Sequence, residues 1–115
     1  MVEQEGIEQG DTIDITFDPQ VGHEQKGRRP ALVVSNNSFN HYSNLVIVCP
    51  ITNTDRGNPF HVKLDCRTKT TGVILTDHIK ALDVYTRKYK YIEKLPNDIL
   101  FNVLNLVGGF VEYNQ

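Results

Sequence analysis

The sequence predicts a mainly β domain with one C-terminal helix, folded as a small, strongly bent β-barrel that the helix closes or flanks. Six or seven short apolar or alternating segments precede residue 93, separated by turn-forming residues, which is typical of strands. After Pro96 the apolar spacing changes to three and four residues, which indicates a helix. The length of 115 residues supports one domain with one core, spanning residues 1–115.

The first predicted strand follows an acidic, polar stretch, residues 1–9, which we expect to be a flexible lead-in. Apolar and polar residues alternate from Ile13 to Phe17, as in a strand with one buried face. Asp18 and Pro19 should end it, because aspartate favours a turn and proline cannot continue the hydrogen-bond ladder.

Two continuous apolar runs, residues 30–35 and 45–49, predict strands buried on both faces. The polar stretch 36–44 between them predicts a loop or one short helical turn. We expect Pro50 to end the second strand. Cys49 lies in that strand, and with only two cysteines in the chain a buried free thiol is expected rather than a disulfide or a zinc site.

Further short strands are expected at residues 60–64, 72–75 and 81–84. Residues 87–92 alternate Arg and Lys with Tyr and Ile and allow two interpretations. One is an edge strand protected by lysines, which we favour, and the other is a basic, aromatic surface for nucleic acid.

The predicted helix has its apolar residues on one face: Ile99, Leu100, Val103, Leu104, Val107, Phe110 and Val111. Pro96 suits the first turn, where its missing N–H has no intrahelical partner. Gly108 and Gly109 weaken the last turns, or they allow another backbone to approach closely.

The charge distribution permits an anionic partner without requiring one. The formal net charge is −2, and residues 1–18 carry six acidic residues and no basic one. Residues 19–115 carry eight acidic and twelve basic residues, so the body of the chain is mildly basic. No apolar run reaches the roughly 20 residues of a membrane helix, and the acidic N-terminus is unlike a signal peptide. We therefore expect a soluble, cytoplasmic protein without a membrane partner.

The segment from Gly22 to Pro30 is the strongest candidate for a ligand site, because it concentrates charge between two predicted strands. Pro30 stiffens the backbone next to Arg29, so we expect Arg29 to be aimed at a phosphate while Arg28 stays mobile. The alternative is a structural ion pair of Arg29 with Asp18 or Glu24.

Other candidate residues carry weaker signals. The Thr52 hydroxyl, just past the second buried run, could bind a ligand or cap a turn. His23 and His78 could act as acids or bases, or could be ordinary surface residues. No metal-ligand spacing and no glycine-rich phosphate loop is present, so no metal and no cofactor is expected.

A set of short motifs occurs in a specific order and spacing: Gly10-Asp11, Phe17-Asp18-Pro19, Gly22-x-Glu24-x-x-Gly27-x-Arg29-Pro30, Val33-x-Ser35, Cys49-Pro50-Ile51-Thr52, Pro59-Phe60-x-Val62 and Gly72-Val73-x-Leu75-x-Asp77. Together they resemble the MazF/PemK family of toxins from bacterial toxin–antitoxin pairs, from about Gly10 to Val111. The combination of Glu-x-x-Gly-x-Arg-Pro with Pro-x-Thr is specific, whereas either piece alone would not be.

The resemblance implies an SH3-like barrel of the MazF/CcdB toxin type, a two-fold symmetric homodimer and a metal-independent endoribonuclease that cuts single-stranded RNA, including mRNA. It places the catalytic pair at Arg29 and Thr52 and the family's loop glutamate at Glu24. It also implies an antitoxin with a flexible, acidic C-terminal tail, and binding of operator DNA only together with that antitoxin.

RNA contacts are expected from His23, Lys26, Arg28, Asp77 and His78. Aromatic side chains of Phe17, Tyr42 and Phe60 are further candidates, although Phe17 and Phe60 suit the core better. The chain departs from many relatives at His78, where they have Gln, and near Val84, where they have Trp. Two alternatives remain at this stage: a fold-related toxin that poisons gyrase, and a non-catalytic SH3-like binding module.

Overall fold

A computed structural model describes residues 6–17 and 27–114. Its strands are β1 (Asp11–Thr16), β2 (Arg28–Val33), β3 (Val46–Thr52), β4 (His61–Lys63), β5 (Val73–Leu75), β6 (Lys80–Leu82) and β7 (Lys90–Lys94). Its helices are α1 (Asn37–Tyr42), the 3-10 turn η1 (Thr76–His78), α2 (Val84–Arg87) and α3 (Asn97–Phe110). The predicted class, mainly β with a C-terminal helix, is therefore confirmed.

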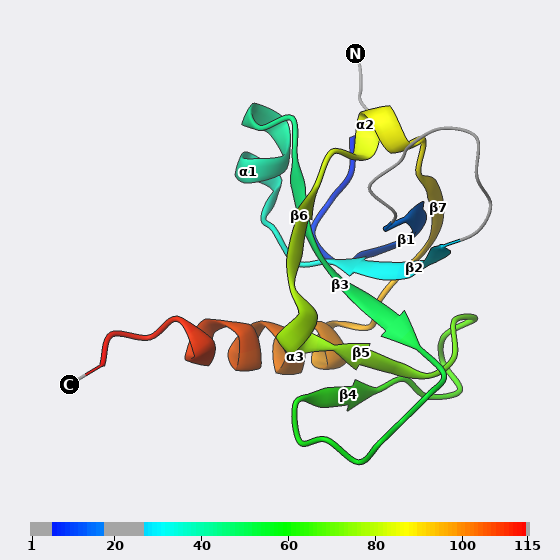
Figure 1. Ribbon diagram of the computed structural model, residues 1–115, viewed down its shortest axis with the longest axis vertical. Coiled ribbons are helices and arrows are strands. Elements are labelled where there is room, and N and C mark those ends of the chain that lie inside the picture. Colours follow the sequence, from blue (N-terminus) through cyan, green and yellow to red (C-terminus); the bar gives the residue numbers. More distant parts are fainter. Residues whose placement is uncertain (1–5, 18–26, 115) are drawn as a thin grey trace.

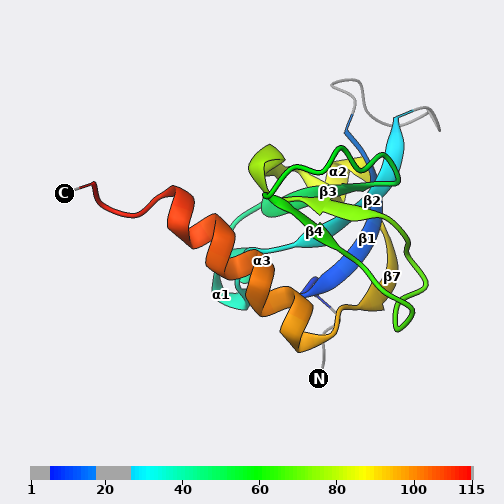
Figure 2. The same ribbon diagram turned by 90° about the horizontal axis from the view of Figure 1, so that it is seen from below.

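All the strand pairs are antiparallel, in the order β4-β5-β3-β2-β1-β7, and β6 also pairs with β3. The sheet bends strongly, as Figure 1 shows. Within the described ranges, its two end strands, β4 and β7, do not pair with each other, so the barrel is not closed by hydrogen bonds. The helix α3 runs beside the sheet, and its C-terminal end extends away from it (Figure 2).

The core has two parts, one on each face of the sheet. One part joins Leu32, Cys49 and Ile74 to the α3 residues Leu100 and Val103. The other part lies within the curve of the sheet and consists of Ile13, Ile15, Ala31, Val33, Val46, Val48, Leu82 and Val84 with Ile7. Alternate residues of β2 and β3 face alternate parts of the core, as the period of two in a strand requires. This double burial explains the continuous apolar runs in the sequence.

Pro50 does not end β3, which continues to Thr52, so the prediction from proline was wrong. The outer neighbour of β3 changes at this point, because β6 pairs with Val46–Val48 and β5 pairs with Ile51 and Thr52. Pro50 lies between these two pairings, at a position that neither β5 nor β6 reaches. Its missing N–H therefore costs no hydrogen bond to either strand.

The helical turn predicted as one alternative for residues 36–44 is present, and the strands expected at 81–84 and 87–92 shift by a few residues. Residues 36–44 contain the short helix α1, capped by the Asn36 side chain, which accepts a hydrogen bond from the Phe39 N–H. The strand expected at 81–84 ends at Leu82, because the Asp83 side chain caps α2. Residues 90–94 form an edge strand whose one partner among the described strands is β1, as favoured from the sequence.

The helix α3 begins after Pro96, which is its N-cap residue rather than part of its first turn. It buries Ile99, Leu100 and Val103. No described atom lies within 4 Å of a side chain added at Gly108 or Gly109, so no backbone approaches them here. No helix among the described residues is long and apolar enough to cross a membrane.

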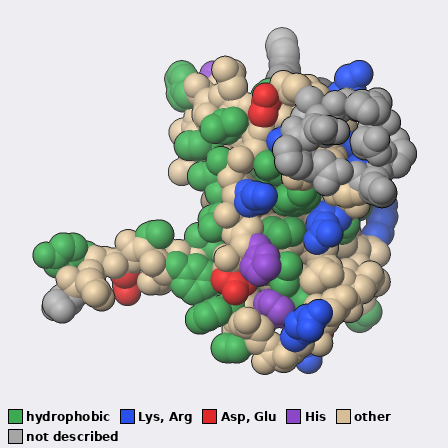
Figure 3. All heavy atoms as spheres, viewed as in Figure 1, with side chains coloured by type: hydrophobic (Ala, Val, Ile, Leu, Met, Phe, Trp, Pro, Cys, Tyr) green, Lys and Arg blue, Asp and Glu red, His purple; other side chains and the backbone are tan. Residues whose placement is uncertain are grey.

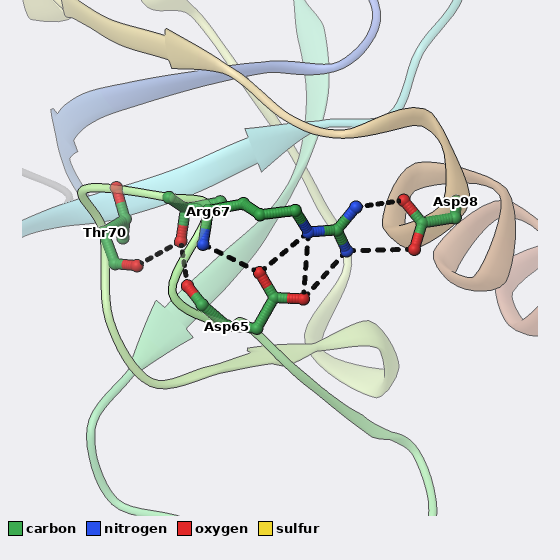
Figure 4. Close-up of polar contacts among 5 residues, drawn as sticks. Asp65, Arg67, Thr70 and Asp98 are labelled. Carbon is green, nitrogen blue, oxygen red and sulfur yellow. Dashed lines mark hydrogen bonds and ion pairs between the residues drawn. The ribbon is translucent and has the colours of Figure 1, made fainter.

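The loop between β4 and β5 is held against α3 by Arg67, as Figure 4 shows. The Arg67 guanidinium donates two hydrogen bonds to Asp98, of 3.0 and 2.9 Å, and further bonds to Asp65. The Glu93 carboxylate of β7 accepts the N–H groups of Lys69 and Thr70. This network fixes the loop and the start of α3 relative to the sheet.

Candidate active site

The strand register brings Arg29 and Thr52 together. Ala31 of β2 pairs with Pro50 of β3, and both strands continue past this pair, so Arg29 and Thr52 lie just beyond the end of the paired region and line one cavity. Both side chains lie on the same face of the sheet as Ala31 and Val48, beyond the end of the buried core.

The Arg29 side chain is exposed, and no hydrogen bond or ion pair engages it within residues 6–17 and 27–114. Its guanidinium therefore offers planar donors to a ligand. The alternative of an ion pair with Asp18 or Glu24 lies outside the described residues, as do the predicted site residues His23, Glu24 and Lys26.

Arg28 is anchored rather than mobile, so the expectation for this residue was wrong. Its Nη2 donates to the backbone oxygens of Asp14, at 3.1 Å, and Lys88, at 3.4 Å. Its Nε donates to the Asp14 carboxylate at 3.4 Å. The cause is the pairing of β1 with β2, which places Asp14 opposite Pro30 and next to Arg28.

The Thr52 hydroxyl caps the turn that follows β3. Its Oγ1 accepts a hydrogen bond of 3.2 Å from the Thr54 N–H. Because the hydroxyl acts as an acceptor in this bond, its own proton remains available to a ligand. Thr52 can therefore both cap the turn and bind a ligand, which are the two roles considered from the sequence.

A cavity of about 390 Å³ lies beside this pair. It is lined by Arg29, Thr52, Thr54, Arg56, Asn58, His61, Leu75 and His78. In the view of Figure 3, histidine and basic side chains gather in the middle of the molecular surface. The structure thus brings together three predicted site residues, Arg29, Thr52 and His78, in a cavity with cationic and hydrogen-bonding walls.

The remaining predicted contacts lie elsewhere. Asp77 does not line the cavity; its Oδ1 lies 3.9 Å from the His78 Nε2. Phe17 packs against the core, Phe60 makes an edge-to-face contact with Phe110, and Tyr42 is exposed on α1. Among the aromatic and histidine candidates described by the structure, only His78 lines the cavity.

The prediction from the sequence missed Arg56 and His61. Arg56 lies in a turn-rich connection that carries no recognisable motif. The alternation in residues 60–64 was a usable signal for His61, because it separates His61 from the buried Val62. His61 faces Asp55, whose Oδ1 lies 3.8 Å from its Nδ1.

The Cys49 thiol is a poor candidate for the chemistry of the cavity. Burial, with a smaller contribution from the Asp77 carboxylate, raises the pKa of Cys49 to about 12, so the thiol is not a nucleophile at neutral pH. Cys49 is free and buried, as expected. Within the described part of the chain, no three His, Cys, Asp or Glu residues are grouped as metal ligands.

Comparison with known proteins identifies the family. Residues 8–110 match the model of the PemK-like, MazF-like toxins of type II toxin–antitoxin systems. The chain is 37% identical over 102 residues to the endoribonuclease PemK of Escherichia coli, covering 85% of this chain and 77% of that protein. It is 35% identical to the endoribonuclease toxin ChpB of Escherichia coli K12, covering 97% and 100%.

Solved structures give the same result. A MazF crystal structure from Deinococcus radiodurans is 36% identical, covers 94% of this chain and 98% of its own, and superposes with a TM-score of 0.82. A MazE–MazF complex from the same organism also gives a TM-score of 0.82 at 36% identity, covering 94% and 97%. With the matching family model and the agreement in fold, the chain belongs to the PemK-like, MazF-like toxins of type II toxin–antitoxin systems.

Proposed function

We propose that this chain is the toxin of a toxin–antitoxin pair and an endoribonuclease that cleaves single-stranded RNA without a metal ion. Its family and its endoribonuclease relatives PemK and ChpB support the class of activity. The observation that carries the proposed site is the exposed Arg29 guanidinium together with the Thr52 hydroxyl on the wall of one cavity.

The proposed reaction is an attack of the RNA 2′-OH on the adjacent phosphorus. The 2′-O–P bond forms and the P–O5′ bond breaks, while the 2′-OH proton is transferred overall to the departing 5′ oxygen. The products are a 2′,3′-cyclic phosphate and a 5′-OH. Arg29 stabilises the charge on the phosphorane, and Thr52 donates a hydrogen bond to a phosphate oxygen. Glu24 orients the 2′-OH or holds Arg29.

Single-stranded RNA suits this surface because its bases are free to turn outward and its phosphates meet exposed cations. His78 contributes to the cavity wall. We assign to His23, Lys26 and Arg28 the guidance of the RNA toward Arg29, and to Asp77 a contact at the border of the site.

The proposed partners are a second copy of the chain, in a two-fold symmetric dimer, and a cognate antitoxin in the cytoplasm. The MazE–MazF complexes of Deinococcus radiodurans support an antitoxin partner. An acidic antitoxin tail would compete with RNA for the Arg29 guanidinium, and operator DNA would bind only the toxin–antitoxin complex.

The test is incubation of the purified protein with a long single-stranded RNA, with and without EDTA. We expect discrete fragments that are insensitive to EDTA and end in a cyclic phosphate. Arg29→Ala and Thr52→Ala should lose most cleavage while remaining folded. Full cleavage by a folded Arg29→Ala protein would contradict the assignment, and intact RNA together with inhibition of gyrase would favour the gyrase-poisoning alternative.

A further inference from the structure

The cavity beside Arg29 and Thr52 contains a buried imidazole that the proposed reaction does not use. His61 begins β4, and its side chain is only 9% exposed. Its Nδ1 is buried without a hydrogen-bond partner in the part of the chain that the structure describes. Asp55 Oδ1 is 3.8 Å away, which is beyond hydrogen-bond range. No hydrogen bond within the described residues engages the His61 ring, and a nearly buried imidazole in a cavity wall that makes no such contact within the fold points to a ligand.

The sheet places His61 on the same face as the reactive pair. His61 pairs with Leu75 of β5, and the next residue of β5, Ile74, pairs with Ile51 of β3. Val62 belongs to the core on the α3 side, so its neighbour His61 projects to the opposite face. His61 therefore lies on the same face of the sheet as Arg29 and Thr52, and it lines the same cavity.

We propose that His61 is a specificity-determining residue that binds the base of an RNA nucleotide adjacent to the cleaved bond; this inference rests on the proposed function. The exposed guanidiniums of Arg29 and Arg56 suit phosphates at the mouth of the cavity. The buried imidazole beside the apolar Leu75 suits a base, because a base can leave a single strand and enter a cavity while its phosphates stay outside.

The position of Asp55 indicates which nitrogen of the His61 ring binds the base. Its Oδ1 is held by a hydrogen bond of 2.9 Å from the Gly57 N–H and faces the His61 Nδ1. A carboxylate on this side suits the tautomer with its proton on Nδ1, and in that tautomer Nε2 is an acceptor. The base therefore donates an N–H to His61. Glutamine places an amide oxygen near the position of Nε2 and should keep this contact, whereas the shorter asparagine should not.

The experiment measures binding without cleavage. Mapping the fragment ends of a long RNA cut by the wild-type protein gives the preferred sequence. An oligonucleotide of that sequence, with 2′-deoxyribose at the cleaved nucleotide, cannot react because the attacking hydroxyl is missing. Its affinity is then measured with each base removed in turn, for the wild-type, His61→Ala, His61→Gln and His61→Asn proteins. His41→Ala is the matched control, since His41 is exposed on α1 and does not line this cavity.

We expect His61→Ala to bind the complete oligonucleotide about tenfold more weakly, the effect of one lost hydrogen bond. At one abasic position the wild-type and Ala proteins should bind equally, because the contact is already absent. The Gln variant should recover most of the affinity, the Asn variant should not, and His41→Ala should match the wild type. The Ala variant should also cleave with the same product ends but tolerate any base at that position. If circular dichroism shows that the Ala variant is unfolded, the difference between the Gln and Asn variants decides the question.

Unchanged affinity in folded His61→Ala, or an equal loss at every abasic position, would overturn the base contact. Uniform loss of cleavage of all sequences would also overturn it. These results would leave the proposed function intact, provided that the wild-type protein cuts RNA. A wild-type protein that does not cut RNA would overturn both.

Discussion

Arg67 and Arg29 carry the same guanidinium, but the protein surrounds them in opposite ways. Arg67 is bound by two carboxylates, with N–O distances of 2.8 Å to Asp65 and 2.9 Å to Asp98. Hydrogen bonds to these carboxylates raise the pKa of Arg67 above its ordinary value. Arg29 has no such partner among the described residues and is exposed on the wall of the cavity.

The comparison separates two uses of one side chain. Arg67 connects the β4–β5 loop to the N-terminus of α3, so its donors are consumed within the fold (Figure 4). Arg29 lies in β2, where it pairs with Ile15 of β1 and has stiff Pro30 beside it, and its donors remain available to a phosphate. Substitutions at Arg29 should therefore affect the reaction, and substitutions at Arg67 should affect stability.

The largest effect is expected from Arg29→Ala. Loss of a donor that stabilises developing charge typically lowers the rate by about 10²–10³. The midpoint of urea unfolding should stay within error of the wild type, because no described contact of the fold is lost. Arg29→Lys keeps the charge but loses the planar fork and should remain well below the wild-type rate. A large drop in the unfolding midpoint of Arg29→Ala would show that Arg29 serves the fold.

Thr52→Val should give the next largest loss, about 10-fold or more, since it removes the hydroxyl and keeps the shape. Thr52→Ser keeps the hydroxyl and should retain most of the cleavage rate. The Val variant also loses the acceptor for the Thr54 N–H, so its unfolding midpoint is measured in parallel. Equal rates for the Val and Ser variants would exclude a role for the hydroxyl.

Gly72→Ala tests whether the position of Thr52 matters. Gly72 has a φ of +110°, and a Cβ added there would lie 2.2 Å from the backbone oxygen of Thr52. Relief of this clash must move β5 or the end of β3, at a cost of about 1–3 kcal/mol in unfolding free energy. We expect lower stability together with slower cleavage, measured by urea unfolding and by RNA fragment formation. Gly57→Ala is the control, because its φ is also positive, at +72°, but nothing lies within 4 Å. Equal cleavage by both variants would show that the site tolerates a shift of Thr52.

The sequence predicted most strands and the helix because these depend on local periodicity. Ile13 and Ile15 alternate as a half-buried strand does, and Ile99 to Val103 follow the helical repeat. Local rules failed at Pro50, where a change of neighbouring strand removes the need for its N–H.

The site was less predictable, because its residues meet only through long-range pairing. Arg29 and Thr52 were selected together by family resemblance, and the register of β2 with β3 supplies the physical reason. The attachment of Arg28 to Asp14 depends on the register of β1 with β2, which no local pattern contains. His61 reaches the cavity only because β4 pairs with β5 and β5 with β3.

The smallest effect on the reaction is expected from Arg67→Ala, which should reduce stability in a pH-dependent way and leave RNA cleavage unchanged. The hydrogen bonds from Arg67 lower the pKa values of Asp65 and Asp98. A carboxyl whose pKa is lowered by folding stabilises the protein above its unfolded pKa, and this contribution is lost as the pH falls through the folded pKa. The difference in unfolding midpoint between wild type and Arg67→Ala should therefore be complete at neutral pH and should shrink below about pH 4.

Glu93 provides an internal control for this titration. Its pKa is also lowered, through hydrogen bonds from the N–H groups of Lys69 and Thr70 that outweigh the opposing effect of burial, so it adds the same pH dependence to both proteins. Comparing the two urea midpoints at each pH cancels the Glu93 contribution, as long as the loop stays on β7. A difference that persists undiminished at about pH 3 would mean that Arg67 acts through packing of its aliphatic stem rather than through the two carboxylates.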